Sequence, residues 1–102
     1  MPLYVIERDI PGVGNMTDEQ SRQTVLASLE VIQEMGDGIQ WVQSYVVEDK
    51  IYCIYFATDE SLIREHARKL DVPANRISEV RRMVNPHGAD KPPCEVAAAD
   101  TA

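Results

Sequence analysis

The stretch Ile39-Gln-Trp-Val-Gln-Ser-Tyr-Val-Val-Glu48, followed after Asp49-Lys50 by Ile51-Tyr-Cys-Ile-Tyr-Phe-Ala57, decides the fold of this chain. Both halves are dense in β-branched and aromatic residues, which fit a pleated and half-buried surface. The short polar break between them is suited to a tight turn. The stretch therefore predicts one β-hairpin.

A helical pattern lies on each side of this hairpin. The first helix is predicted to begin at the capping box Thr17-Asp18-Glu19-Gln20 and to end at Gly36. The second is predicted to begin at Thr58-Asp59-Glu60 and to stop before Pro73. The apolar stripe expected on the first consists of Val25, Leu26, Leu29 and Ile32. The inward face expected on the second consists of Leu62, Ile63, His66, Ala67 and Leu70.

A strand-like run lies outside each helix, at residues 2–9 and at residues 77–84. The order β-α-β-β-α-β predicts an α+β, ferredoxin-like fold, with two helices on one face of a four-stranded antiparallel sheet. We expect residues 1–84 to form this domain. From residue 85 onward the composition changes to Pro, Gly, Ala, Asp and Lys, and residues 85–102 are predicted to be a flexible C-terminal tail.

The turn of the hairpin determines which residues share a face of the sheet. A two-residue turn at Asp49-Lys50 pairs Val46 with Cys53 and puts Trp41 on the face of Tyr45, whereas a three-residue turn puts Tyr45 on the face of Cys53. Either register leaves substantial apolar area on the face that the helices do not cover. Because large exposed apolar patches mark interfaces, we expect a homodimer through that face.

Composition excludes several classes of protein. The chain has 102 residues and a net charge of -7, which argues against a nucleic-acid-binding surface because such a surface needs clustered Lys and Arg. No apolar run is long enough to span a membrane, and the N-terminus has no signal-peptide pattern, so we expect a cytoplasmic protein. A disulfide between Cys53, in a predicted strand, and Cys94, in the predicted tail, is not expected.

Few residues are suited to chemistry. His66 is the only histidine in the predicted domain, and it is either a buried histidine with a local partner or a metal ligand or acid/base group. Glu7 and Arg8 end the first strand and alternate between its two faces. Cys53 lies in the third strand and lacks the spacing to a second Cys or His that zinc sites show. No pairing of a nucleophile with a base is evident, so no catalytic residue is predicted.

The loop Pro11-Gly-Val-Gly-Asn15 follows the first strand. Its Gly-x-Gly spacing invites comparison with phosphate-binding loops, but the third glycine and the Gly-Lys-Ser/Thr ending are absent. We interpret it as a plain connecting loop.

Three segments resemble a family of small bacterial ferredoxin-like domains of unknown function, some of whose members are described as nickel-binding proteins. The segments are Tyr4-Val-Ile-Glu-Arg-Asp-Ile-Pro-Gly12, Tyr52-Cys-Ile-Tyr-Phe-Ala57, and Ile63-Arg-Glu-His-Ala-Arg68 continuing to Val72-Pro-Ala-Asn-Arg-Ile-Ser-Glu-Val80. The resemblance covers nearly all of residues 2–84. It implies a dimer that binds a divalent cation, nickel being the ion that the family label suggests, with His66 and Glu7 as metal ligands. Arg8 and Cys53 are further candidate site residues.

Two main classes of function follow. The first is a non-enzymatic metal-binding dimer. The alternative is a small-molecule-binding or enzymatic domain with its site between helices and sheet, where His66 acts as acid/base and Arg8 holds an anion. A pure interaction module, with Trp41, Tyr45 and Tyr52 serving only a dimer, is a third interpretation. We favour the first because of the resemblance.

Overall fold

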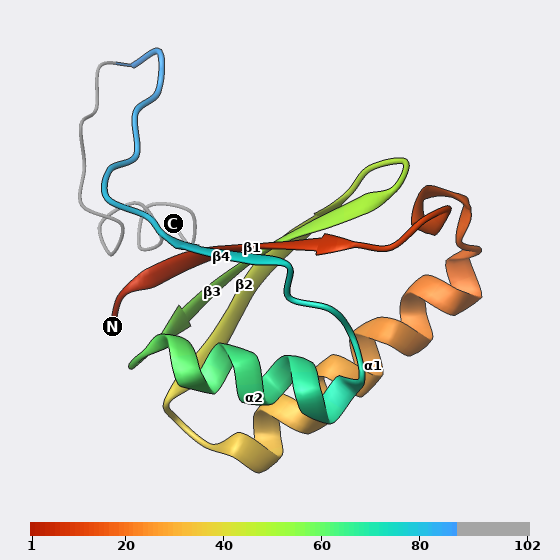
Figure 1. Cartoon of the computed structure of the whole chain (residues 1–102), viewed down its shortest axis with the longest axis horizontal. Coiled ribbons are helices and arrows are strands. Elements are labelled where there is room, and N and C mark those ends of the chain that lie inside the picture. The colour runs from red at the N-terminus through yellow and green to blue at the C-terminus, as the bar shows by residue number, and fades with distance from the viewer. Residues whose placement is uncertain (88–102) are drawn as a thin grey trace.

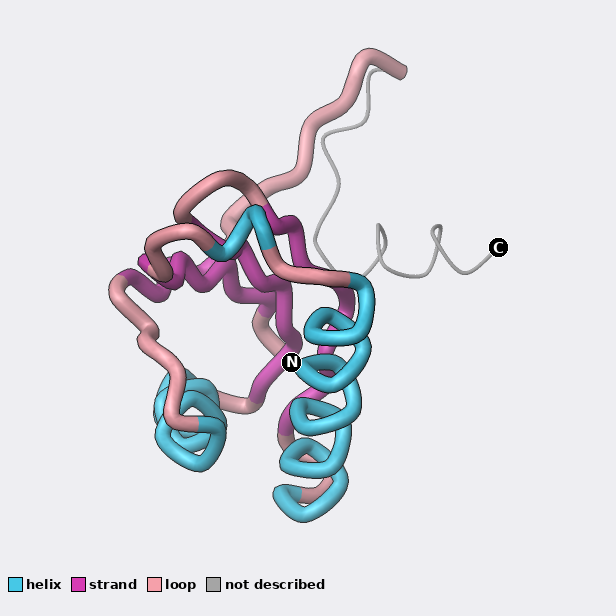
Figure 2. Tube along the Cα trace, turned by 90° about the vertical axis from the view of Figure 1, so that its right-hand side faces the viewer, coloured by secondary structure: helices cyan, strands magenta, loops and turns pink. Residues whose placement is uncertain are grey.

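Four strands form one antiparallel sheet in the spatial order β2-β3-β1-β4, and two helices cover one of its faces (Figures 1 and 2). The structure is a computed structural model that describes residues 1–87. Its elements, in chain order, are β1 (Leu3–Asp9), the short 3-10 helix η1 (Val13–Asn15), α1 (Asp18–Met35), β2 (Ile39–Val46), β3 (Lys50–Ala57), α2 (Glu60–Leu70) and β4 (Arg76–Glu79). This arrangement confirms the predicted ferredoxin-like fold. The predicted tail, residues 85–102, lies outside the described residues except for its first three positions.

The hairpin turn has two residues, as in the first predicted register, but it lies one residue earlier than Asp49-Lys50. Val46 pairs with Ile51 and Ser44 with Cys53, so the two turn residues are Glu48 and Asp49. The glycine loop after β1 accounts for the shift, because it holds the turn from the side. The Gly12 N–H donates to the Asp49 carboxylate at 2.8 Å, and the Ile10 N–H donates to the Asp49 carbonyl at 3.0 Å.

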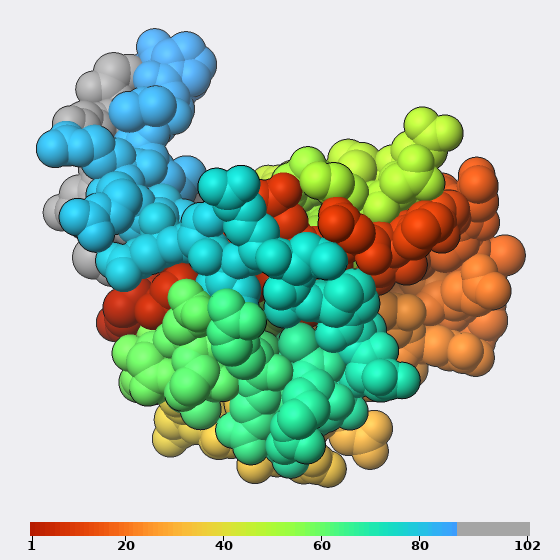
Figure 3. Space-filling model, viewed as in Figure 1, coloured from red at the N-terminus to blue at the C-terminus, as the bar shows by residue number. Residues whose placement is uncertain are grey.

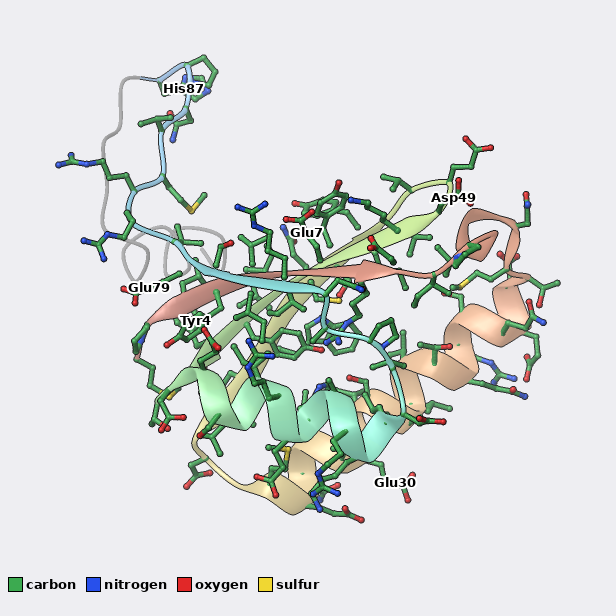
Figure 4. All side chains as sticks on the ribbon, in the orientation of Figure 1. Tyr4, Glu7, Glu30, Asp49, Glu79 and His87 are labelled. Carbon is green, nitrogen blue, oxygen red and sulfur yellow. The ribbon has the colours of Figure 1, made fainter. Side chains whose placement is uncertain are left out.

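The two glycines of this loop, Gly12 and Gly14, have structural roles that do not involve phosphate binding. Gly12 has a φ of 76°, a left-handed conformation that favours glycine. Gly14 donates its N–H to the Glu48 carbonyl at 2.9 Å, and a Cβ at this position would lie 2.8 Å from the Val47 carbonyl oxygen. The interpretation of residues 11–15 as a connecting loop is therefore supported, and its structural role is to support the hairpin turn (Figure 4, near Asp49).

A β-bulge at Val42 corrects the predicted position of Trp41. The register shifts between Trp41 and Gln43, so Trp41 pairs with Tyr55 on the helix-covered face. The two rings stack with centroids 6.5 Å apart, and the Trp41 indole N–H donates to the Ser44 hydroxyl at 2.9 Å. The prediction that Trp41 shares a face with Tyr45 is wrong, because simple alternation does not count the extra residue.

The last strand is shorter than predicted, ending at Glu79 rather than residue 84. It pairs with β1 over four residues. The connection from α2 to β4 is anchored to β1 as well: the Asn75 side chain accepts from the Asp9 N–H at 2.7 Å, and the Asn75 N–H donates to the Glu7 carbonyl at 2.9 Å. In Figure 3 this segment covers the middle of β1 from the viewer's side.

The two helices contribute differently to the core. Both predicted N-termini are confirmed, with a complete capping box between Thr17 and Gln20 in α1 and Asp59 as the N-cap of α2. α2 buries Ile63, His66 and Ala67, whereas α1 buries only Ser28. The stripe predicted on α1 is largely exposed, because Val25, Leu26 and Leu29 do not reach the sheet, while Ile32 packs against the core. The described helices include none long and apolar enough to cross a membrane.

Candidate functional site

Strand β1 sends its charged residues to two different sides of the sheet. Arg8 pairs with Ile51 and projects, like Ile6, toward the helices, where only 3% of its surface is exposed. Glu7 pairs with Tyr52 and projects to the face without helices, as Figure 4 shows. The predicted alternation of Glu7 and Arg8 is therefore confirmed. The two predicted site residues occupy separate environments.

Arg8 is a buried cation with incomplete hydrogen bonding. Its Nη1 donates to the Pro73 carbonyl at 2.8 Å, and its Nε lies 3.4 Å from the Cys53 sulfur as donor. Its Nη2 is buried and has no partner, and within the described residues 1–87 no carboxylate forms an ion pair with Arg8. Arginine is rarely buried without a counter-charge, because desolvation of the guanidinium is costly.

His66 lies beside this cation under the helices. It is fully buried at 0% exposure, and its ring contacts Tyr55 with centroids 5.2 Å apart in a tilted arrangement. Its Nε2 and the Ser28 hydroxyl oxygen are 3.3 Å apart, while its Nδ1 has no partner. Burial, together with the nearby positive charge of Arg8, lowers the pKa of His66 to about 4. The imidazole is therefore neutral near pH 7.

Cys53 and Tyr55 project from β3 between these groups. Both side chains are buried on the helix-covered face. Of the two predicted registers, the structure therefore agrees with the one that puts Cys53 and Tyr45 on different faces. Burial raises the pKa of Tyr55, an effect to which Cys53 adds and which Arg8 partly offsets. Tyr55 therefore stays a neutral phenol and does not neutralise Arg8. Cys53 is a free cysteine.

A cavity of about 280 Å³ lies between α1, the sheet and the end of α2. Arg8 and Cys53 contribute to its floor, and Ser28 contributes from α1. The rest of the wall is largely apolar and includes Ile10, Val13, Met16, Val25, Trp41, Val46, Ile51, Tyr55, Leu70 and Val72. Because α1 does not bury Val25 against the sheet, the space beneath this helix is incompletely filled.

The other face carries a solvated group of ion pairs. Lys50 Nζ lies 3.5 Å from a Glu7 oxygen and 3.6 Å from an Asp9 oxygen, and Arg76 Nε lies 4.0 Å from the second Glu7 oxygen. The nearby charge of Asp9 raises the pKa of Lys50, which is already protonated near neutrality. Acid and base are thus balanced at this end of the face.

The predicted metal ligands do not meet within one chain. Glu7 and His66 lie on opposite sides of the sheet, and residues 1–87 contain no group of three or more His, Cys, Asp or Glu side chains that could hold a metal ion. His66 alone has one property that suits a ligand, a neutral ring with an unpartnered nitrogen. Three residues of the predicted tail, His87, Asp90 and Cys94, are also of metal-ligating types. His87 lies beyond β4, away from Glu7 (Figure 4), and Asp90 and Cys94 lie outside the described residues. A complete site therefore does not fit the described part of a single chain.

Comparison with known proteins identifies the family. A model of the nickel-responsive proteins similar to SCO4226 matches residues 4–80. The chain belongs to this family. No functionally curated protein is similar enough to count as a match.

A solved structure of the family's namesake has the same fold. The crystal structure of SCO4226 from Streptomyces coelicolor A3(2) superposes with a TM-score of 0.67, covering 80% of this chain and 99% of that chain at 19% sequence identity. At this identity the similarity supports the fold. The resemblance to a small bacterial ferredoxin-like family, seen in the sequence, is confirmed.

Sequence reasoning missed part of the helix-side site. It singled out Arg8, Cys53 and His66, which the structure brings together on one side of the sheet. It did not select Ser28 or Pro73, because their contacts with His66 and Arg8 join residues 38 and 65 positions apart. One signal was present for Ser28: it is three residues after Val25 and four before Ile32, and so lies on the stripe of α1.

Proposed function

We propose that this protein is a non-enzymatic homodimer that binds a divalent metal ion, with nickel preferred. The observation that carries the proposal is membership of the nickel-responsive family over residues 4–80. The side chains of His66 and Glu7 are compatible with this proposal, since imidazole nitrogen and carboxylate oxygen are both ligands for nickel.

The open face of the sheet supports the dimer. Val5, Tyr52, Ile54 and Phe56 are half-buried there although no helix covers them, and Tyr45 beside them is 54% exposed. Such a patch on an open sheet face is typical of an interface between subunits. A second copy packed face to face would remove these side chains from water.

The dimer would also add metal ligands. Glu7 and Asp9 project from the same open face, so a two-fold partner would present a second pair of the same carboxylates to it. Their ion pairs with Lys50 and Arg76 are 3.5–4.0 Å long and partly exposed, so little free energy opposes their exchange for a metal ion. We therefore assign Glu7 as the ligand shared across the dimer. His66, on the other side, is the competing assignment.

Calorimetric titration of the metal-stripped full chain with nickel and with zinc tests metal binding. We expect saturable binding with nickel preferred, and its loss in Glu7→Gln. Glu30→Gln is the matched control, because Glu30 lies on α1 remote from the sheet (Figure 4) and its loss should leave binding unchanged. Loss in His66→Ala but not in Glu7→Gln would move the ion to the helix side. Binding no stronger to nickel than to zinc, and equal in all variants, would reject the proposal.

Sedimentation of the same proteins tests the dimer. Ile54→Asp places a charge at the centre of the open face and should convert a dimer to a monomer. Leu26→Asp is the control, because Leu26 is 58% exposed on α1 and lies on the opposite side of the molecule. A wild-type monomer at micromolar concentration, with and without nickel, would contradict the dimer.

A further inference from the structure

We propose that the cavity between the helices and the sheet binds a small organic carboxylate, with Arg8 pairing with its anionic group and an apolar body lying against Trp41 and Tyr55. This site is independent of the proposed metal site, because Glu7 projects from the other face of the sheet. A family of nickel-responsive proteins does not imply it. The inference comes from the charge, the hydrogen bonding and the lining of the cavity.

Arg8 is incompletely paired. Its guanidinium is 3% exposed and donates to the Pro73 carbonyl and to the Cys53 sulfur, and the Tyr55 hydroxyl also interacts with it. Its Nη2 is buried and has no hydrogen-bond acceptor within the described residues. A carboxylate is the group that best matches the fork of donors on a guanidinium, and it would also neutralise the buried charge.

His66 and Tyr55, which lie next to Arg8, are both neutral. Burial and Arg8 lower the pKa of His66 to about 4, and burial raises the pKa of Tyr55. At neutral pH Tyr55 is therefore a phenol and does not compete with an anionic ligand for Arg8, and His66 is uncharged. The positive charge of this side of the sheet remains available to a ligand.

The rest of the cavity wall is largely apolar. The cavity volume of about 280 Å³ lies near the lower end of the range of small-molecule sites, about 300–1,000 Å³, which suits a small organic acid. Apart from Arg8, its lining is mostly aliphatic and aromatic, with hydroxyls from Ser21, Thr24, Ser28 and Ser44. Pockets with one charged group on an apolar wall typically bind amphipathic small molecules.

Trp41 provides a direct readout of binding. It is the only tryptophan of the chain and lies on the cavity wall. The probes are phenylacetate, 4-phenylbutyrate and octanoate, each paired with its neutral amide, added to the full chain at pH 7. We expect saturable quenching of Trp41 fluorescence by at least one acid, with binding roughly tenfold or more tighter than that of its amide.

Two pairs of variants separate the site from non-specific effects. Arg8→Gln should weaken acid binding roughly tenfold or more, whereas Arg22→Gln, the same change at an exposed arginine of α1, should not. Val25→Phe should fill the cavity and weaken binding, whereas Leu26→Phe, at the next position but outside the lining, should not. The Val25 pair keeps the test valid if Arg8→Gln fails to fold.

Three results would overturn the inference. One is the absence of saturable quenching by every acid up to about 10 mM, a concentration at which even weak specific sites fill. Another is equal affinity for acids and amides. The third is binding that survives both Arg8→Gln and Val25→Phe, which would place the probe elsewhere on the protein.

Discussion

The two faces of the sheet differ in the exposure and pairing of their charged side chains. On the helix-covered face, Arg8 is desolvated, lacks a counter-ion among the described residues and lies beside the neutral His66. On the open face, Glu7 and Lys50 are partly exposed and form long ion pairs. Yet Glu7 and Arg8 are adjacent residues of β1.

Electrostatic interactions are strong on the helix-covered side of the sheet and weak on the open side. Water screens the open-face pairs, so each contributes little to stability, whereas the low dielectric beneath the helices makes the charge of Arg8 felt by every group near it. A change on the helix side should therefore alter stability and pKa values far more than a similar change on the open side. Pairs of matched substitutions test this contrast.

The largest effect is expected from the apolar residues of β1. Ile6 is fully buried between Cys53 of β3 and Ile77 of β4, whereas its neighbour Val5 is half-buried on the open face. We expect Ile6→Ala to lower the free energy of unfolding by about 3 kcal/mol, because it leaves a cavity in the core. Val5→Ala should lose about 1 kcal/mol or less.

Urea unfolding followed by Trp41 fluorescence measures both losses. The difference between the losses in Ile6→Ala and Val5→Ala should be greatest in dilute protein. If the open face forms a dimer, the loss in Val5→Ala should increase with protein concentration, because the interface is then part of the folded state. If Ile6→Ala and Val5→Ala lost equal stability at every protein concentration, the distinction between the two faces would be contradicted.

The next effect concerns pH. The pKa of His66 is about 4 in the folded chain, against an ordinary value of 6.5, so the unfolded chain binds the proton more readily. The contribution of neutral His66 to stability is therefore complete above pH 6.5 and is lost as the pH falls toward 4. A shift of this size corresponds to about 3 kcal/mol.

The difference between the wild-type protein and His66→Gln isolates this contribution, because the carboxylates titrate in both proteins. The wild type should lose more stability than the variant between pH 6.5 and 4. Arg8→Met should also raise the pKa of His66, as measured by the chemical shift of its ring protons, since it removes a nearby positive charge. A pKa of His66 near 6.5 in the wild type would contradict the burial seen in the structure.

A smaller effect is expected from Arg8 itself. Arg8→Met removes an unpaired buried cation but also the hydrogen bond to the Pro73 carbonyl. We expect a gain of about 1 kcal/mol in the free energy of unfolding, since apolar residues often replace buried charges without loss. Arg22→Met, at an exposed arginine, should change stability by less than about 0.5 kcal/mol. A loss in Arg8→Met would mean that the Pro73 and Cys53 contacts outweigh the cost of desolvation.

The sequence was sufficient for the order of the elements and for the sides of β1. Helix caps at Thr17 and Asp59 depend on residues within three positions, and alternation separates Glu7 from Arg8 by local geometry alone. These features needed no knowledge of the tertiary structure. They account for the success of the fold prediction.

The features that sequence reasoning missed depend on distant contacts. The turn moved to Glu48 and Asp49 because residues about 37 positions earlier hold it, and the bulge at Val42 has no glycine or proline to mark it. The predicted stripe of α1 assumed full contact with the sheet, but Leu26 and Leu29 remain 58% and 48% exposed. The cavity arises from this incomplete contact. Periodicity predicts which face of a helix is apolar, not how closely the helix approaches its neighbour.

The smallest effect is expected from Glu7→Gln on the open face. Its ion pairs with Lys50 and Arg76 are long and partly exposed, and such pairs typically contribute about 0–1 kcal/mol. Without metal, the change in stability should be small in dilute buffer and should vanish in about 1 M salt, where charges are screened beyond roughly 3 Å. Thermal unfolding at the two salt concentrations measures it.

Nickel turns this weak substitution into a sensitive test of the contrast between faces. A ligand that binds only the folded chain raises the unfolding temperature according to its concentration and affinity. Wild-type protein and Arg8→Met should therefore gain stability in nickel, while Glu7→Gln should not. If Glu7→Gln gains as much as the wild type, the metal does not bind at the open face, and the exposed ion pairs there have no role beyond solubility and packing.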